Sequence, residues 1–430
     1  AGLGLALLYA FVAHGAFFAD ELRFVHLLVV ASCVVAFAVR PPEWADLRAP
    51  TSVAVALVSA ALVGTAALAD DVRGSLTGLR VVVVLGLAAL VVRRLGEDVR
   101  RAVLSWLVAG GTIVALAGWA GVAFRRVPFA QPAQGLWRAA STITYANALA
   151  CLLAVLVLVL LSGALRWPRW HTAAASFVLL TGLGATLSRS GLLALVAGLA
   201  VVAWTVGPRR LGLDLAAPIA GAALALAGLL PSIAGTRASP AVAAAALAAG
   251  ALCAVAPVPR LALIAVLVAV PVVMVAAPQQ VRRLAYARLA PGSDTRSPEW
   301  RVALRAARER PLTGVGPTAP LPGPRSTGPN GTVATWIHSE PLGVLARQGI
   351  AGGAANMSAF VVLVVAGMRT RRRMPPGMWA AGAAGGMAVA VHSLFDITWH
   401  VPVLPLLGAV VLSVALYPPQ SQIEDGRRQS

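Results

Sequence analysis

Long apolar runs, each bounded by polar or charged residues, recur along the whole chain. Most are close to the length of about 17 to 25 residues that a helix needs to cross bilayer hydrocarbon. Lipid offers no partner for backbone N–H and C=O groups, so such runs must be helical. The fourteen candidate spans are 1–18, 24–39, 50–69, 76–92, 102–124, 145–161, 172–187, 190–206, 212–234, 240–256, 260–277, 341–367, 376–394 and 400–417.

The pattern predicts an all-α, polytopic integral membrane protein with about 12–14 transmembrane helices and one long basic extracytoplasmic loop. We interpret residues 1–18 as a span and not as a cleaved signal peptide. Three segments are expected: N-terminal transmembrane helices over 1–144, a transmembrane core over 145–417 that includes the loop 278–340, and a cytoplasmic tail over 418–430.

Composition excludes an ordinary soluble domain. Of the 430 residues, 59% are hydrophobic and 12% are charged, whereas soluble domains carry roughly 25% charged residues. All 35 basic residues are arginine, giving a net charge of +19. Most arginines stand at the ends of apolar runs, which favours membrane lipids over nucleic acid as partners. The three cysteines, Cys33, Cys151 and Cys253, lie inside apolar spans without metal-ligand spacing and are interpreted as packing residues.

The short connections form two alternating sets with unequal numbers of arginines. One set carries fifteen: Arg40, Arg48, Arg93, Arg94, Arg100, Arg101, Arg166, Arg169, Arg209, Arg210, Arg260, Arg369, Arg371, Arg372 and Arg373. The other carries seven: Arg23, Arg73, Arg125, Arg126, Arg138, Arg189 and Arg237. Arginine-rich short connections stay in the cytoplasm, so the first set and both termini are predicted to be cytoplasmic. The connection 125–144 departs from the pattern, because it places three arginines outside.

The connection 278–340 lies on the predicted extracytoplasmic side and holds nine arginines against three acidic residues before Glu340. Long connections are not bound by the positive-inside rule, and an anionic ligand would explain the excess. Residues 297–310 predict a helix that ends before Pro311, with an apolar face and an arginine face. The apolar face is Trp300, Leu304 and Ala307, and the basic face is Arg301, Arg305 and Arg308. These arginines could rest among lipid headgroups or clamp phosphate.

Four polar groups are expected on the same outer face as this loop. Arg189 stands in the segment TLSRSG, and His338, followed by Glu340, begins a span. A histidine at a helix mouth can act as a general base near neutral pH. Asp396 stands between His392 and His400. This spacing would allow a metal-binding face, but Pro402 and the short turn argue against one continuous helix, so no metal is predicted.

Several segments, in order, carry a resemblance to a known family. TLSRSG at 186–191, PLTGVGP at 311–317, IHSEPLGVLARQGIAGG at 337–353 and HSLFDITWH at 392–400 resemble the O-antigen ligase / Wzy polymerase superfamily, and YANALACLLA at 145–154 is similar to another of its segments. The resemblance covers about the C-terminal two thirds of the chain. It implies a glycosyltransferase of the cytoplasmic membrane, active at the outer face, with no nucleotide sugar, metal or other cofactor.

The resemblance also implies the partners and the residue roles. The donor would be a glycan on a polyprenyl diphosphate such as undecaprenyl diphosphate, and the acceptor a hydroxyl of a glycan, lipid or protein. Arg189, Arg301 and Arg305 would bind the diphosphate, His338 would be the base, and Glu340 or Asp396 would orient it. Ser339 replaces the asparagine that usually follows this histidine, which puts the acceptor in question.

Other functions stay open on the sequence. A surface-polysaccharide polymerase or a protein O-glycosyltransferase would have the same pattern as a ligase. A secondary transporter would show internal repeats and charges at mid-span, whereas the candidate residues lie at span ends. A non-catalytic scaffold would not need the histidine.

Overall fold

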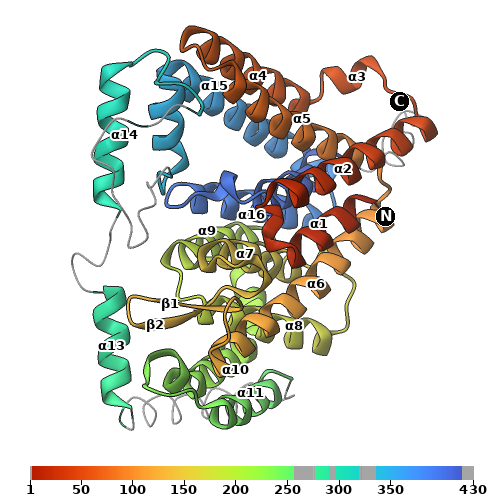
Figure 1. Ribbon diagram of the computed structural model, residues 1–430. Helices are drawn as coiled ribbons and strands as arrows, with labels where there is room; N and C mark the ends of the chain where they lie inside the picture. The colour runs from red at the N-terminus through yellow and green to blue at the C-terminus, as the bar shows by residue number, and fades with distance from the viewer. Residues whose placement is uncertain are drawn as a thin grey trace.

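The computed structural model describes residues 2–255, 275, 277–289, 296–318, 321 and 336–418. These residues are helical apart from connections and one short hairpin (Figure 1), which confirms the predicted all-α class. The helices are α1 (Gly2–Val12), α2 (Ala19–Val39), α3 (Trp44–Leu47), α4 (Pro50–Leu68), α5 (Val72–Arg94), α6 (Glu97–Phe124), α7 (Ala146–Leu161), α8 (Arg169–Ala185), α9 (Arg189–Val206), α10 (Pro208–Ala234), α11 (Pro240–Val255), α13 (Pro278–Leu289), α14 (Ser297–Glu309), α15 (Glu340–Thr370), α16 (Pro376–Ser393) and α17 (Val403–Leu416).

Seven of the described helices are long and apolar enough to cross a membrane: α2, α4, α5, α6, α9, α10 and α15. The shorter apolar helices are α1, α7, α11 and α17. A continuous span over 1–18 is wrong, because α1 ends at Val12 and a single helical turn follows, in which Gly15 adopts a φ of 70°. The candidate span 260–277 lies almost wholly outside the described residues. The total of 12–14 spans stays a prediction.

Where the structure describes them, the connections of the two predicted sets lie toward opposite ends of the helix bundle (Figure 1). At one end Arg93 pairs with Asp46 at 3.2 Å, and the buried Arg100 donates to the Leu95 carbonyl at 2.9 Å and to the Tyr417 carbonyl. Guanidinium groups suit these positions because the last carbonyls of α5 and α17 lack partners within their helices. In Figure 1 α13 and α14 lie across the other end of the bundle, α13 beside the hairpin and α14 beside α15.

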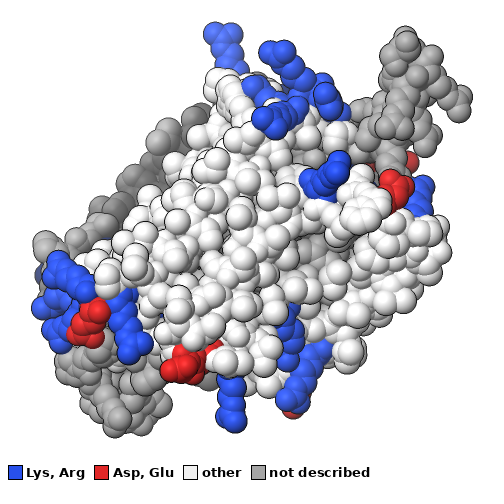
Figure 2. Space-filling model, turned by 90° about the horizontal axis from the view of Figure 1, so that it is seen from above, with Lys and Arg blue, Asp and Glu red and all other residues white. Residues whose placement is uncertain are grey.

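The surface separates charge from apolar area in the way that a membrane requires. Figure 2 shows one face on which charged side chains lie along the rim, while the broad middle carries none. Large apolar side chains are exposed on several helices, among them Leu27, Trp106, Ile113 and Val196. Patches of this kind on a soluble protein would drive association, whereas lipid covers them at no cost.

Helix α7 is the centre of the bundle. Every residue from Ala146 to Leu161 is buried, and α6, α8, α9 and α16 pack around it. A helix that is apolar on all sides must be enclosed by others. Its N-terminal end, where Tyr145 and Asn147 lie, is therefore held by packing on all sides, and the polar groups described below contact it.

The connection between α6 and α7 contains the one strand pair among the described residues. Strands β1 (Ala130–Ala133) and β2 (Leu136–Ala139) are antiparallel, with Ala130 opposite Ala139. The two turn residues, Gln134 and Gly135, both have positive φ, 54° and 73°, which matches the twist of a two-residue hairpin. The hairpin directs Arg138, on β2, toward α7.

Helix α15 is interrupted at Gly349, where φ is 63°. The segment after α14 pairs with the interruption: Val315 N–H donates to the Ala346 carbonyl at 3.0 Å, and Ile350 N–H donates to the Pro311 carbonyl at 2.8 Å. A broken membrane helix is tolerated where other groups satisfy the released backbone. The segments PLTGVGP and LARQGIAGG thus form one joint, which fixes α14 against α15.

Candidate active site

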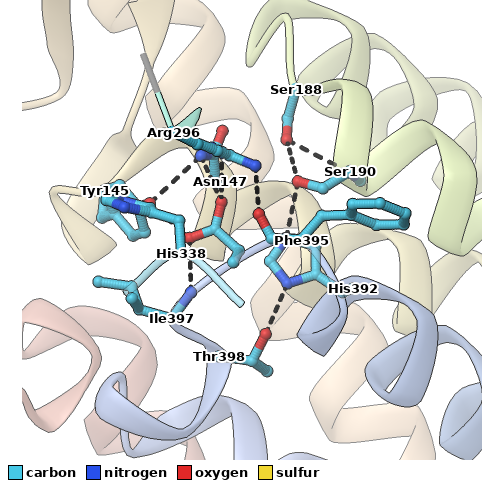
Figure 3. Close-up of polar contacts among 12 residues, drawn as sticks. Tyr145, Asn147, Ser188, Ser190, Arg296, His338, His392, Phe395, Ile397 and Thr398 are labelled. Atoms are coloured by element: carbon cyan, nitrogen blue, oxygen red, sulfur yellow. Dashed lines mark hydrogen bonds and ion pairs between the residues drawn. The ribbon is translucent and has the colours of Figure 1, made fainter. Parts of the chain in front are cut away.

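The site centres on the carboxylate of Asp396, which is fully buried in the connection between α16 and α17. Tyr145 Oη donates to Oδ1 at 2.5 Å, and Asn147 Nδ2 donates to Oδ2 at 2.6 Å. Arg296 pairs with Oδ2 at 3.0 Å, and the Ile397 N–H donates to Oδ1 at 2.9 Å. Figure 3 shows these side chains converging from the start of α7, from the residue before α14 and from the connection between α16 and α17. With this many donors, Asp396 joins the three segments and is poorly placed to take a proton from substrate.

Arg296 was not among the residues that the sequence singled out. It directly precedes α14, pairs with Asp396 and also donates to the Phe395 carbonyl. Because several arginines recur on the predicted helix itself, the arginine just before that helix did not stand out as a candidate ligand. The signal available in the sequence was its place beside Ser297 and Pro298, at the point where the predicted helix begins.

Arg301 and Arg305 lie on the exposed face of α14. The helix packs instead through Ala303 and Ala306, which contact a cluster that includes Ile337 and Ala346. The expected apolar face was partly wrong: Trp300 and Ala307 are partly buried, but Leu304 is 41% exposed. Close packing of α14 on the start of α15 selects small residues, so the alanines face inward. The role of Arg301 and Arg305 as diphosphate ligands stays a prediction.

Arg138 forms a second layer around the end of α7. Its Nε donates to the Thr186 carbonyl at 2.8 Å, and its Nη2 donates to Asn147 Oδ1 at 2.6 Å. Burial lowers the pKa of Arg138, and the charges of Arg296 and Arg189 add to that effect, while Tyr145 and Asp396 oppose it. The three outer arginines of the 125–144 connection looked anomalous in the sequence, and the structure places one of them inside the site.

The segment SRSG starts α9 and joins a chain of hydroxyl and imidazole groups. Ser188 caps the helix by accepting from the Gly191 N–H at 3.3 Å, and its Oγ lies 3.1 Å from that of Ser190. Ser190 Oγ lies 3.3 Å from His392 Nε2, and His392 Nδ1 lies 2.8 Å from Thr398 Oγ1 (Figure 3). Both ring nitrogens of His392 thus have hydrogen-bond partners, so this buried histidine links α9 to the connection between α16 and α17. Sequence reasoning did not assign it this role.

Arg189, the first residue of α9, is exposed at the same end of the bundle, and its Nη1 donates to the Arg288 carbonyl of α13 at 3.3 Å. It therefore lies where the sequence expected it, beside the basic loop.

His338 lies just before α15, partly buried, and contacts Glu299 of α14. Its Nδ1 is 2.8 Å from Glu299 Oε2, and its backbone N–H donates to the same oxygen at 3.1 Å. An ionised carboxylate only accepts, so Nδ1 carries the proton and Nε2 has the free lone pair. Burial disfavours the charged ring, but the hydrogen bond and charge of Glu299 outweigh it and raise the pKa of His338. The charge of Arg296 favours the neutral ring, but its effect on the pKa of His338 is smaller than that of Glu299.

Glu340 and His400 serve other contacts. Glu340 Oε1 accepts a hydrogen bond from the Trp399 N–H at 2.7 Å, which links the start of α15 to the connection between α16 and α17. We expected Glu340 or Asp396 to orient His338; Glu299 makes that contact. The centroid of the His400 ring lies 4.2 Å from that of the Trp336 ring, with the two ring planes tilted by 57°. Burial, together with the charge of Arg347, lowers the pKa of His400 to about 4.

In the described part of the chain, no three His, Cys, Asp or Glu side chains are placed to share a metal ion. His392, Asp396 and His400 therefore do not form the metal-binding face that their spacing allowed.

Comparison with known proteins gives one match to a protein family. No curated protein matches the chain. The model of the O-antigen ligase family matches residues 222–357, a stretch that includes α13, α14, Glu299, His338 and the joint at Gly349. This match confirms the resemblance seen in the sequence and supports a membrane enzyme that handles glycans, and over residues 222–357 the chain is similar to the O-antigen ligase family.

Proposed function

We propose that this protein is a glycosyltransferase of the cytoplasmic membrane. It moves a glycan from a polyprenyl diphosphate to an acceptor hydroxyl at the extracytoplasmic face. The observation that supports this most is the contact between His338 and Glu299 at the same end of the bundle as Arg138, Arg189, Arg288 and Arg296. A base and a group of cations are the two parts that this reaction needs, since its leaving group is already activated.

His338 would act as the general base. The acceptor hydroxyl attacks the anomeric carbon, its proton passes to His338 Nε2, and the bond from that carbon to the diphosphate oxygen breaks. Glu299 stabilises the imidazolium that forms, because it already accepts from Nδ1. Direct attack inverts the configuration of the anomeric carbon. Asp396 and Glu340 act in this scheme by holding the backbone and the arginines in place.

Cations would stabilise the departing diphosphate. Negative charge grows on its oxygens as the sugar leaves, and preorganised guanidinium groups stabilise that charge in a water-poor site. Arg189, which contacts α13, and Arg296, which pairs with Asp396, are the arginines best placed to bind the diphosphate. Arg301 and Arg305, on the exposed face of α14, remain candidates for the same role.

Ligase, polymerase and protein O-glycosyltransferase share this chemistry and differ in the acceptor. Transfer by the purified full-length protein, with undecaprenyl diphosphate-linked glycan as donor, tests the proposal. We expect release of undecaprenyl diphosphate to depend on an added acceptor and to continue in EDTA. Product analysis then identifies the acceptor class. Release that never requires an acceptor, or no glycan transfer to any of the three acceptor classes, would contradict the proposal.

A further inference from the structure

Four arginines, Arg369 and Arg371–Arg373, gather at the end of α15 that lies away from His338. The part of this helix that follows Gly349 is about 30 Å long at 1.5 Å per residue, which is the thickness of bilayer hydrocarbon. Arg371 is partly buried, and the other three arginines are exposed. In the part of the chain that the structure describes, no carboxylate pairs with any of the four.

Arg371 is held in place by two aromatic rings. Its guanidinium carbon lies 3.7 Å from the centroid of the Trp204 ring and 5.5 Å from that of the Trp379 ring. The Trp379 ring is itself fixed, because its Nε1 donates to the Gly367 carbonyl at 2.7 Å. An aromatic face attracts a cation but carries no full negative charge. The positive charge of Arg371 is therefore positioned without being neutralised.

The arginines line an open hollow of about 680 Å³. Among the described residues, its lining consists of Met368, Arg369, Arg371 and Arg372. This volume is within the range of about 300–1,000 Å³ that sites for small ligands occupy. Retention of a connection in the cytoplasm depends only on the number of basic residues near the span ends. That role therefore explains neither the hollow nor the two rings that hold Arg371.

An apolar stripe on α15 leads to this hollow. Its exposed side chains are Phe360, Val361, Val364, Val365 and Met368. Their spacing of three and four residues places them on one side of the helix, whereas another side of α15 packs on α4 and α17. Met368 belongs to both the stripe and the hollow. A ligand that matches both features has a negatively charged head and hydrocarbon chains.

Charge selects among the lipids that have such a form. Phosphatidylcholine and phosphatidylethanolamine carry a positive group beside the phosphate, and the four arginines would repel that group. An anionic phospholipid lacks it, and each basic residue at the membrane surface adds to the attraction of such a lipid. Guanidinium groups also match pairs of phosphate oxygens. The chemistry therefore favours an anionic phospholipid.

We propose that Arg369, Arg371 and Arg372 form a binding site for one anionic phospholipid of the leaflet at this end of the bundle. Its phosphate lies in the hollow, against the guanidinium that Trp204 holds, and its acyl chains lie along the apolar stripe of α15. The lipid thereby links the ends of α9, α15 and α16. This site is separate from the one proposed for glycan transfer, and the inference does not rest on that function.

Native mass spectrometry of the purified full-length protein in neutral detergent, titrated with phosphatidylglycerol, tests the site. We expect one phosphatidylglycerol to stay bound at concentrations at which phosphatidylcholine does not. The double variant Arg369→Gln/Arg372→Gln removes two exposed charges. It should weaken binding of phosphatidylglycerol about thirtyfold, since each basic residue at an anionic surface contributes about fivefold.

The matched control is the double variant Arg166→Gln/Arg169→Gln. Both of these arginines are exposed in another connection of the same arginine-rich set, so the same charge is lost. The control should bind phosphatidylglycerol as the wild type does. Wild-type affinity in Arg369→Gln/Arg372→Gln, or an equal loss in the control, would overturn the inference.

A third variant separates an ordered site from a general attraction between charges. Trp204→Leu leaves every charge in place but removes the ring nearest to Arg371, so it should also weaken binding of phosphatidylglycerol. Wild-type affinity in Trp204→Leu would leave only a diffuse attraction and overturn the site.

Thermal unfolding gives an independent readout. A ligand that binds only the folded state raises the unfolding temperature, so phosphatidylglycerol should raise it for the wild type and the control. Without lipid, Arg369→Gln/Arg372→Gln should unfold at the wild-type temperature, because both side chains are exposed, and phosphatidylglycerol should raise that temperature little. Equal stabilisation by phosphatidylcholine, or binding of soluble glycerol 3-phosphate with the same affinity as phosphatidylglycerol, would contradict an anionic lipid site.

Discussion

At the scale of single residues, His338 carries the sharpest prediction. Proton removal must accompany attack by a hydroxyl, and general-base catalysis typically contributes about 10²–10⁴-fold. His338→Ala should lower glycan transfer by that factor while undecaprenyl diphosphate still binds. His392→Ala should instead lower the unfolding temperature, because His392 joins Ser190 to Thr398. Transfer at the wild-type rate in His338→Ala would rule out the mechanism.

Glu299 predicts a specific pH dependence. The base works when His338 is neutral, and Glu299 raises the pKa of that ring above its ordinary value of 6.5. Activity should therefore fall as the pH drops through this raised pKa. Glu299→Gln removes the charge that raises it, so the acid limb of the pH–rate profile should move to lower pH while the plateau falls. An acid limb that does not move would separate Glu299 from the base.

Arg296 and Arg301 can be compared directly. Arg296 pairs with the buried Asp396, whereas Arg301 is exposed on α14. Removing one partner of a buried pair leaves an uncompensated charge, so Arg296→Ala should cost both stability and transfer. Arg301→Ala should leave stability unchanged. Measured transfer in Arg301→Ala then decides whether Arg301 contacts the diphosphate.

At the scale of elements, the joint between the 311–317 segment and α15 fixes the distance between α14 and α15, and with it that from Glu299 to His338. A Cβ at Gly349 would lie 2.4 Å from the Leu312 backbone, and φ there is 63°. Gly349→Ala should therefore destabilise the protein by about 1–3 kcal/mol and lower transfer. Gly353→Ala on the same helix, where a Cβ would meet no atom within 4 Å, is the control. Equal unfolding temperatures in the two variants would contradict the role given to the joint.

At the scale of the whole molecule, the two ends of the bundle should face opposite sides of the membrane. A variant lacking Cys33, Cys151 and Cys253 allows single cysteines to be labelled. Leu312, which is 68% exposed, should label from outside when changed to Cys, and Arg372, exposed at the other end, only after permeabilisation. Labelling of Leu312→Cys from the cytoplasmic side alone would remove the proposed site from the extracytoplasmic face.

The positions of helices followed from the sequence, because apolar length alone specifies a membrane helix. The ends of these helices did not always follow: α1 stops at Val12, where Gly15 takes a left-handed conformation. The alternation of arginines along the chain also predicts two sets of connections, since each helix must return the chain to the other end.

The partners of the polar residues were decided by the tertiary structure. Sequence alone placed Arg189, His338 and Asp396 at one end, because span ends are visible in the apolar pattern. It could not show that Glu299 contacts His338 or that Arg296, and not Arg301, reaches Asp396. These contacts join residues 39 and 100 positions apart. They depend on the rotation of α14, which the packing of Ala303 and Ala306 against the start of α15 sets, and a helical period fixes which residues share a face but not which face turns inward.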